Sequence, residues 1–435
     1  MRHGPGSTLA RSAYALLLRL ALPLYALRVL WRGRREPLYA QAIGERFGRY
    51  DGAPATPGAL WVHAVSLGET LAAAPLLAAL RAAEPALRIV LTHSTATGRA
   101  AGQALLRAGD VQSWLPFDTP GAVARFLDRF QPAAGVLLET EIWPNLLAAA
   151  ERRGLPVLLA NARRSATSHR RGRRVDALLR PAFASLAAAC AQSEADAERL
   201  RDAGVARVSV LGNLKFDATP EPALLSRGRQ WKAATGGRAV VLAAVTREGE
   251  EEPLFARWRA LPAPRPLLVV VPRHPQRFDA VAALAAAAGL TLSRRSAWPD
   301  APPPGAEAAD LWLGDSMQEM AAWYALADVA LLGGSFAPLG GQNLIEAAAC
   351  GCPVVMGPHT FNFAEAAALA LAAGAALRAP DLAAALERAL ALIGDGEERT
   401  RRAQAGLAFA ATHRGAARRT AAAVVDLLRG RSGGA

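Results

Sequence analysis

The feature that most limits how this chain can fold is a repeated alternation of short apolar runs with amphipathic or alanine-rich stretches. Continuous apolar runs are typical of strands buried on both faces, and the stretches between them supply the helical crossovers of a parallel sheet. The first set of predicted strands is Leu60 to His63, Ile89 to Thr92, Val111 to Leu115, Gly135 to Leu138, Val157 to Ala160, Leu186 to Ala191 and Val208 to Leu211. The second set is Ala239 to Ala244, Leu267 to Val271, Asp310 to Leu313, Val329 to Leu332 and Pro353 to Met356. We therefore predict an α/β protein with two Rossmann-like, doubly wound domains that face a cleft.

Size and composition agree with two domains. The chain has 435 residues, of which 52% are hydrophobic, and a single core stops growing below that length. The segment ATPEP at 218–222 is a plausible linker. The formal net charge of +13 indicates an acidic partner, which means phosphates, nucleic acid or an anionic membrane. Three cysteines in apolar segments exclude a disulfide scaffold and fit a reducing compartment.

The N-terminal region is apolar but carries arginines. Between Leu9 and Trp31 the charged side chains are Arg11, Arg19 and Arg28. An arginine near the bilayer centre costs roughly 2.5–3.5 kcal/mol, and the uninterrupted runs are shorter than the roughly 20 residues needed to span. We predict that residues 1–35 form a membrane-associating helix that lies in an anionic membrane or is shallowly inserted into it. If the helix spans instead, its arginines place the following domain in the cytoplasm. The alternative is an ordinary apolar helix packed on the protein body.

A glycine-rich segment, LLGGSFAPLGGQNLIEAAACGCPVVMGP at 331–358, connects an apolar strand to a helix. Glycines at such a junction allow backbone N–H groups to approach an anion, and the positive end of the helix favours negative charge. Glu346, one turn into that helix, is suited to accept hydrogen bonds from sugar hydroxyls. A phosphate next to a ribose is the predicted ligand. The alternative is that Asn343 to Glu346 is only a helix cap with a reciprocal acid.

Polar residues also gather where the predicted strands end. Because ligands of doubly wound sheets bind at the carboxyl ends of the strands, so many polar residues there indicate a lined cleft. A lone polar residue at such a place is more often a turn or a cap. The polar residues are His63, Ser66, His93, Thr95, Glu139, Glu141, Asn161, Arg163, Arg273 and His274. Gly314 also follows a predicted strand.

Read in order, these segments resemble the Kdo (3-deoxy-D-manno-octulosonic acid) transferases of lipopolysaccharide assembly, which are glycosyltransferases of GT-B architecture. The resemblance covers nearly the whole chain, from WRGRREPLY near Trp31 to the helices after Thr360. It rests on HAVSLGET at 63–70, ETEIWPN at 139–145, NARRS at 161–165, GNLKFD at 212–217, VPRHPQRF at 271–278, GDSMQEM at 314–320, GGQNLIEAAA at 340–349 and MGPHTFNF at 356–363. One residue departs from the pattern, since Gln342 occupies a position where many relatives have His.

The resemblance implies catalytic roles for three residues. Glu69 is expected to be the general base, and Glu139 and Lys215 are expected to stabilise the transition state. From local sequence alone, Ser66 to Glu69 is also a capping box, Glu139 a charge before the helix that Pro144 begins, and Lys215 a solvated loop lysine.

The resemblance also implies substrate contacts in the second half of the chain. The residues expected to bind the cytidine nucleotide are Pro272, Arg273, Gly314, Met317, Gln318, Glu319, Gly340, Gly341, Asn343 and Glu346. No Asp-x-Asp pair in a metal-binding loop is evident, so we expect no metal ion and no other cofactor.

The implied function is transfer of Kdo from cytidine monophosphate–Kdo (CMP-Kdo) to a hydroxyl of the lipid A precursor (lipid IVA), with inversion, at the cytoplasmic face of the inner membrane. The expected partners are this donor, this acceptor and an anionic membrane surface, but not nucleic acid. The arginines of 163–180 are expected to meet phosphates of lipid A or phospholipid. The alternatives are another GT-B nucleotide-sugar transferase or an epimerase, and a non-catalytic basic protein that binds membranes or nucleic acid.

The expected division of the chain follows from these predictions. Residues 1–35 form the membrane helix, 36–217 the acceptor-binding domain, 218–428 the nucleotide-sugar-binding domain, and 429–435 a disordered tail.

Overall fold

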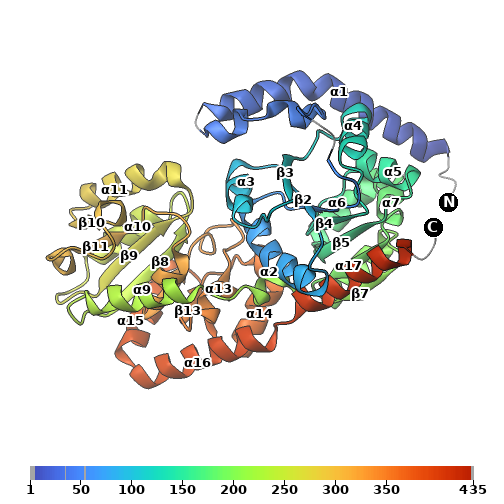
Figure 1. The fold of residues 1–435 in the computed structure, drawn as a ribbon. Helices are drawn as coiled ribbons and strands as arrows, with labels where there is room; N and C mark the ends of the chain where they lie inside the picture. The colour runs from blue at the N-terminus through green and yellow to red at the C-terminus, as the bar shows by residue number, and fades with distance from the viewer. Residues whose placement is uncertain (1–4, 35, 53–54, 433–435) are drawn as a thin grey trace. The chain divides into compact units, whose positions relative to one another are not determined.

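A computed structural model describes residues 5–34, 36–52 and 55–432. The chain divides into two compact units (Figure 1), the first formed by Met1–Ala218 with Arg414–Ala435 and the second by Thr219–His413. Each unit contains a seven-stranded sheet in which all strand pairs are parallel. The prediction of two doubly wound α/β domains is confirmed.

The sheet of the first unit has the order β3-β2-β1-β4-β5-β6-β7. Its strands are β1 (Leu60–His63), β2 (Ile89–His93), β3 (Val111–Trp114), β4 (Ala134–Leu138), β5 (Val157–Ala162), β6 (Ala188–Ala191) and β7 (Val208–Val210). Its helices are α1 (Pro5–Gly33), α2 (Leu67–Ala83), α3 (Ala96–Gln103), α4 (Pro120–Phe130), α5 (Pro144–Arg152), α6 (Ala166–Gly172), α7 (Asp176–Ala184), α8 (Glu194–Asp202) and α17 (Ala416–Ser432). The strand order reverses between β1 and β4, which is where doubly wound sheets bind ligands.

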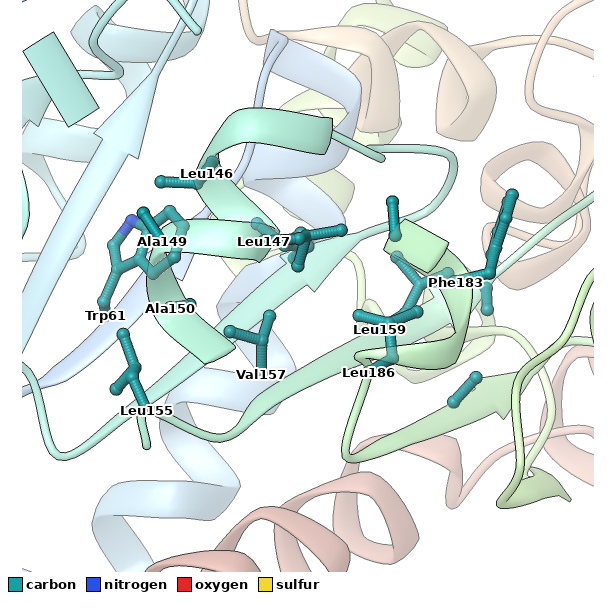
Figure 2. Packing of buried hydrophobic residues seen from close by; sticks show 14 of the residues in the cluster. Trp61, Leu146, Leu147, Ala149, Ala150, Leu155, Val157, Leu159, Phe183 and Leu186 are labelled. Carbon is teal, nitrogen blue, oxygen red and sulfur yellow. The ribbon is translucent and has the colours of Figure 1, made fainter. Parts of the chain in front are cut away.

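Two apolar layers cover the two faces of this sheet. On one face Trp61 packs with side chains of α4 and α5. Figure 2 shows Val157 near Leu147 and Ala150 of α5, and Leu159 near Phe183 of α7. The strand residues alternate between the faces, so Leu60 and Val62 contribute to the opposite layer together with α2 and α17. The sheet is thus buried on both sides, which explains why its strands are continuous apolar runs.

The last helix belongs to the first unit, not to the second as the sequence predicted for residues up to 428. In α17, Val424 and Val425 are buried in the same layer as Leu76 and Leu77 of α2. Burial of the two valines contributes about 3–6 kcal/mol as an upper estimate. The helix reaches Ser432, so the predicted disorder of 429–435 is wrong for 429–432, and 433–435 lie outside the described residues.

The sheet of the second unit has the order β10-β11-β9-β8-β12-β13-β14, with the reversal between β8 and β12. Its strands are β8 (Val240–Thr246), β9 (Leu267–Pro272), β10 (Leu292–Arg294), β11 (Leu311–Leu313), β12 (Val329–Leu332), β13 (Val354–Met356) and β14 (Ala376–Arg378). Its helices are α9 (Pro222–Ala233), α10 (Glu251–Arg259), α11 (Phe278–Ala287), α12 (Met320–Leu326), α13 (Leu344–Ala349), α14 (Ala364–Ala372), α15 (Leu382–Gly394) and α16 (Gly396–Thr412). Edge strands β10 and β14 were not predicted.

Candidate active site

In the first unit, Glu69 and Glu139 follow the two strands that flank the strand-order reversal. Glu69 lies in the first turn of α2, three residues after the end of the β1–α2 connection at Ser66, and Glu139 follows β4 directly. Strands β1 and β4 are neighbours in the sheet, with Leu60 paired to Ala134. Because the carboxyl ends of parallel neighbours meet at one edge, this topology brings the two predicted catalytic carboxylates to the same end of the sheet.

The Glu69 side chain is fixed by its own helix start. Its Oε2 accepts a hydrogen bond from the Val65 N–H at 2.8 Å, and its Oε1 accepts from the Ser66 hydroxyl at 3.2 Å. Ser66 in turn caps α2 by accepting from the Glu69 N–H. The cap and a held carboxylate therefore coexist, and the capping explanation does not exclude a chemical role.

The pKa of Glu69 is raised to about 7, chiefly by burial, with the Val65 N–H lowering it and the negative charges of Glu139 and Glu141 raising it. A carboxyl with a pKa near neutrality is better matched to proton transfer than an ordinary glutamate, because it is ionised at neutral pH yet retains proton affinity. Burial therefore outweighs the hydrogen bonds to the ionised carboxylate, which lower its pKa.

Glu139 and Lys215 form an ion pair. Lys215 Nζ lies 2.7 Å from Glu139 Oε1, and the two side chains are 17% and 13% exposed. Lys215 is therefore not a solvated loop lysine. Glu139 itself has a φ of +58°, which is uncommon for a residue other than glycine. Its backbone is held there because its N–H donates to Ala160 and its carbonyl accepts from the Arg163 N–H.

A buried amide, Asn161, connects the two members of this pair. Asn161 is 1% exposed, its Nδ2 lies 3.5 Å from Glu139 Oε1, and its Oδ1 accepts from the Leu214 N–H at 3.0 Å. The Asn213 side chain caps the same short turn by accepting from the Lys215 N–H at 3.0 Å. The NARRS and GNLKFD segments thus position the lysine against the glutamate.

A third carboxylate, Glu141, belongs to this site but was not among the residues given a role from the sequence. Its Oε2 accepts from Trp143 Nε1 at 2.8 Å and lies 3.8 Å from Nε2 of His63. Burial raises the pKa of Glu141 to about 7, and burial lowers that of His63 to about 3, so His63 is neutral. Its signal in the sequence was its place after a predicted strand, among the polar residues expected to line the cleft.

In the second unit the glycine-rich loop follows β12, again at the strand-order reversal. Gly334, Gly340 and Gly341 have φ of +67°, +91° and +73°. A Cβ at Gly333 would lie 2.4 Å from the Val245 carbonyl oxygen, so this position excludes any side chain. The loop therefore needs glycine for its conformation and for close packing.

The prediction that the glycine N–H groups face an anion is wrong for most of them. The Gly334 N–H donates to the buried Glu250 carboxylate at 2.8 and 2.9 Å. The N–H groups of Gly333 and Gly341 donate to Ala244 and Gly334, each at 2.8 Å. These donors are occupied within the unit, and Asn343 caps α13 by accepting from the Ile345 N–H.

Positive charge near this loop comes from side chains instead. Arg273 follows β9, its N–H is fixed to the Thr246 carbonyl at 2.9 Å, and its side chain is exposed. In the described part of the chain its guanidinium has no hydrogen-bond or ion-pair partner, whereas Arg277 is held by Glu251 through two bonds of 2.7 and 2.8 Å. Burial lowers the pKa of His274, and the charges of Arg273 and Arg247 lower it further, which places both arginines close to it.

The predicted nucleotide contacts at 314–319 separate into two groups. Gly314 is enclosed, since a Cβ would lie 2.7 Å from Val271 Cγ2. The Glu319 carboxylate already receives two bonds from Arg295, both 2.9 Å, and one from Arg227 of 2.9 Å. Met317 and Gln318 are exposed. Met317 and Gln318 are thus available to a ligand, and the Glu319 side chain is committed to an internal ion-pair network.

Glu346 does not form the reciprocal bond that the capping alternative required. Its carboxylate has no hydrogen-bond partner among the residues that the structure describes, and burial raises its pKa to about 7. Pro272 is buried at the end of β9, and a Cβ at Gly340 would lie 2.2 Å from Asn362 Nδ2. Of the predicted contacts near the loop, Arg273 and Glu346 are therefore the charged side chains without a partner among the described residues.

Comparison with known proteins gives a consistent result. Residues 41–218 match the N-terminal glycosyltransferase family described as 3-deoxy-D-manno-octulosonic-acid transferase (kdotransferase). A 3-deoxy-D-manno-octulosonic acid transferase of Bordetella pertussis is 49% identical over 97% of this chain and 100% of its own length. The chain belongs to the Kdo transferase family. A second member, from Haemophilus influenzae, is 35% identical over 96% of this chain and 98% of its own length.

Among solved structures, the UDP-GlcNAc 2-epimerase of Neisseria meningitidis is similar in fold, with a TM-score of 0.55, 16% identity and coverage of 85% of this chain and 99% of its own. A glycosyltransferase of Rickettsia africae gives a TM-score of 0.55 at 11% identity over 86% of this chain and 99% of its own. This Kdo transferase family member therefore has the two-domain α/β fold of GT-B proteins.

Proposed function

We propose that this Kdo transferase family member moves Kdo, with inversion, from CMP-Kdo to a hydroxyl of the lipid A precursor (lipid IVA) in lipopolysaccharide assembly. The observation that carries the proposal is full-length similarity to named Kdo transferases, in a chain whose first unit holds a fixed carboxylate of raised pKa at the strand-order reversal.

The chemistry assigns a different task to each carboxylate. The Glu69 carboxylate takes the proton of the acceptor hydroxyl as that oxygen forms a bond to the anomeric carbon of Kdo. At the same time the bond from that carbon to the phosphate oxygen breaks, and CMP leaves with the electron pair. General base catalysis of this kind is typically worth about 100- to 10,000-fold in rate. Lys215, oriented by Glu139, supplies fixed positive charge for the negative charge that develops.

The second unit supplies the groups for the donor. Arg273, with no partner in the described residues, is suited to pair with the phosphate, and Glu346 is suited to accept from a hydroxyl of the ribose. The exposed side chains of Met317 and Gln318 complete the proposed nucleotide contacts. We assign Gly314, Gly340 and Gly341 to the shape of the site, and Asn343 to the cap that begins α13.

The assay is direct. Purified protein is incubated with CMP-Kdo and lipid IVA, and the product is weighed by mass spectrometry, which also gives the number of Kdo residues added. We expect a mass increase with CMP-Kdo and none with Glu69→Gln, while Glu84→Gln at the other end of α2 behaves as the wild type. Transfer from a uridine nucleotide sugar but not from CMP-Kdo would overturn the assignment.

We also propose that α1 holds the protein on the inner membrane, at its cytoplasmic face. The helix is long and apolar enough to cross a membrane, with a mean hydropathy of 1.6, but only 11% of its most apolar window is buried. It packs beside α5 and α7 (Figure 1), where Ala15 is buried, and Val29 is buried with Tyr39 and Trp114. Its exposed large apolar side chains are Leu9, Leu16, Leu17, Leu20, Leu24, Tyr25, Leu27, Leu30 and Trp31. Leucines exposed this extensively favour a membrane surface over packing on the body.

Replacing Leu16, Leu20 and Leu24 by Gln tests this location. These side chains are 57%, 68% and 71% exposed. At about 1.5–3 kcal/mol for a fully transferred leucine, losing all three should weaken binding to vesicles of bacterial lipids by at least about 100-fold in a flotation assay. Leu407→Gln, at an exposed leucine of α16, is the control. Unchanged flotation of the triple variant would contradict the proposal.

Basic residues of 163–180 contribute to the same surface only in part. Arg164 is buried over the Phe183 ring and bonds to His169, and Arg180 pairs with Asp176. Arg170, Arg171, Arg173 and Arg174 are exposed. These four are the ones we propose for contact with lipid phosphates.

A further inference from the structure

A cavity of about 240 Å³ lies within the first unit where α1 packs on the body. It is smaller than the roughly 300–1,000 Å³ of sites for drug-sized ligands, so it fits a small group. Asn145 and Arg152 face it from α5, two turns apart on the same side of that helix. Its lining residues are Arg11, Ser12, Ala15, Pro120, Asn145 and Arg152.

The charged side chains that line this cavity have the same sign. Both charged lining residues, Arg11 and Arg152, are basic, and they come from two different helices. In the part of the chain that the structure describes, neither guanidinium has a hydrogen-bond or ion-pair partner. Burial lowers the pKa of Arg152, the charges of Arg11 and Arg153 lower it further, and the charge of Glu151 raises it, so these groups lie close to one another. The next residue differs, since Arg153 pairs with Asp128 at 2.8 Å.

Of the nearby acids, Asp118 bonds to other groups. Asp118 accepts from Tyr14 Oη of α1 at 3.1 Å and from the N–H groups of Asn145 and Leu146 at 3.1 and 2.7 Å. Asp118 is thus occupied in joining α1 to the start of α5. Glu151 lines a narrower hollow with Ser7 and Arg11, and its charge raises the pKa of Arg152, so it offsets part of the positive charge.

Two guanidinium groups that line one cavity, without a hydrogen-bond or ion-pair partner among the described residues, attract an anion more strongly than either does alone. We propose that the cavity between α1 and α5 is a binding site for one phosphate group, with Arg11 and Arg152 as its two cationic arms. Guanidinium groups bind phosphate through paired, charge-assisted hydrogen bonds, and Ser12 adds a hydroxyl donor. The phosphate comes either from a phospholipid headgroup or from free phosphate. This site is separate from the carboxylates proposed for transfer.

Titration calorimetry of the full chain in non-ionic detergent tests the proposal. One arm uses inorganic phosphate and the other uses dihexanoyl phosphatidylglycerol, a soluble phospholipid. We expect saturable binding of one ligand per chain, and a loss of at least about tenfold in affinity for the double variant Arg11→Gln/Arg152→Gln. The matched control is Arg49→Gln/Arg107→Gln, which removes the same charge from two exposed arginines outside the cavity and should stay within about twofold of the wild type.

A second variant separates a built site from diffuse charge and protects the test if the first variant folds poorly. Arg11→Lys/Arg152→Lys keeps both charges but loses the planar fork, so a phosphate site predicts weaker binding, and diffuse attraction predicts no change. Lipid binding at least tenfold tighter than phosphate binding identifies a headgroup as the source, and equal binding identifies free phosphate. Absence of saturable binding of both ligands, or equal losses in the site and control variants, would overturn the site. Kdo transfer is assayed separately, so the two proposals fail independently.

Discussion

The raised pKa of Glu69 predicts how the rate of transfer depends on pH. Only the ionised carboxylate accepts a proton, and burial raises the pKa of Glu69 from 4.5 to about 7. Activity is therefore lost as the pH falls through about 7. The ionised fraction is about one in eleven at pH 6 and about ten in eleven at pH 8, so kcat/KM should rise about tenfold over this interval. An unperturbed glutamate would change the rate by only about 3%.

The assay is the initial rate of product formation from CMP-Kdo and lipid IVA between pH 5.5 and 8.5, with both substrates below saturation. Glu141 also has a pKa raised to about 7, so its titration must be separated from that of Glu69. In Glu141→Gln the acidic limb should persist and move to lower pH, because one negative charge near Glu69 is removed. Glu69→Gln should reduce kcat/KM by about 100- to 10,000-fold at pH 8.

Two results would refute this reasoning. A flat profile between pH 6 and 8, measured with the chemical step rate-limiting, means that no group of raised pKa is needed in its ionised form. Disappearance of the acidic limb in Glu141→Gln transfers the role of base to Glu141. Glu84→Gln is the control, because Glu84 ends the same helix and pairs at the surface with Arg429.

Three further predictions concern the ion pairs and the loop. Lys215→Gln should lower kcat by about 100- to 1,000-fold in single-turnover experiments, because the charge held 2.7 Å from Glu139 is lost, and a wild-type rate would exclude its role. Gly333→Ala should destabilise the second unit by about 1–3 kcal/mol in thermal unfolding, because its Cβ would lie 2.4 Å from the Val245 oxygen. The control Gly394→Ala should be near neutral, because a Cβ there would have nothing within 4 Å. Equal melting temperatures of the two variants would contradict the steric argument. Glu319→Gln should cost about 3 kcal/mol in urea unfolding, since Arg295 and Arg227 lose their partner. A KM for CMP-Kdo raised more than tenfold without loss of stability would instead make Glu319 a substrate contact.

The parts of the fold that sequence predicted best are those fixed by local pattern. Strands buried on both faces are uninterrupted apolar runs, so β1, β4 and β9 were predicted to within a few residues. Edge strands β10 and β14 were missed because each has three residues, ends in arginine and is buried on fewer sides. A sequence run of that length and composition shows no periodicity that would distinguish a strand from a loop.

What the sequence did not predict depends on contacts between distant residues. The glycine N–H groups were expected to be free to bind an anion, but the Gly334 N–H donates to the carboxylate of Glu250, which lies 84 positions earlier. The hydrogen bond from Arg227 to the Glu319 carboxylate likewise joins residues that are 92 positions apart. The place of α17 is also set over a long range, because its apolar side fits α2 at the other end of the chain. Local spacing predicts which residue types are present, and tertiary packing decides which of them remain available.

The return of α17 has a consequence for synthesis on the ribosome. The chain leaves the first unit at Ala218 and comes back at Arg414, where Asp217 accepts from the N–H groups of Gly415 and Ala417. The nascent second unit is thus complete while the first still exposes the leucines of α2 that await its closing helix. A chain that stops near residue 413 has a complete second unit but lacks the last helix of the first unit. Nonsense mutations close to the 3′ end of the coding region should therefore cause the first unit to aggregate.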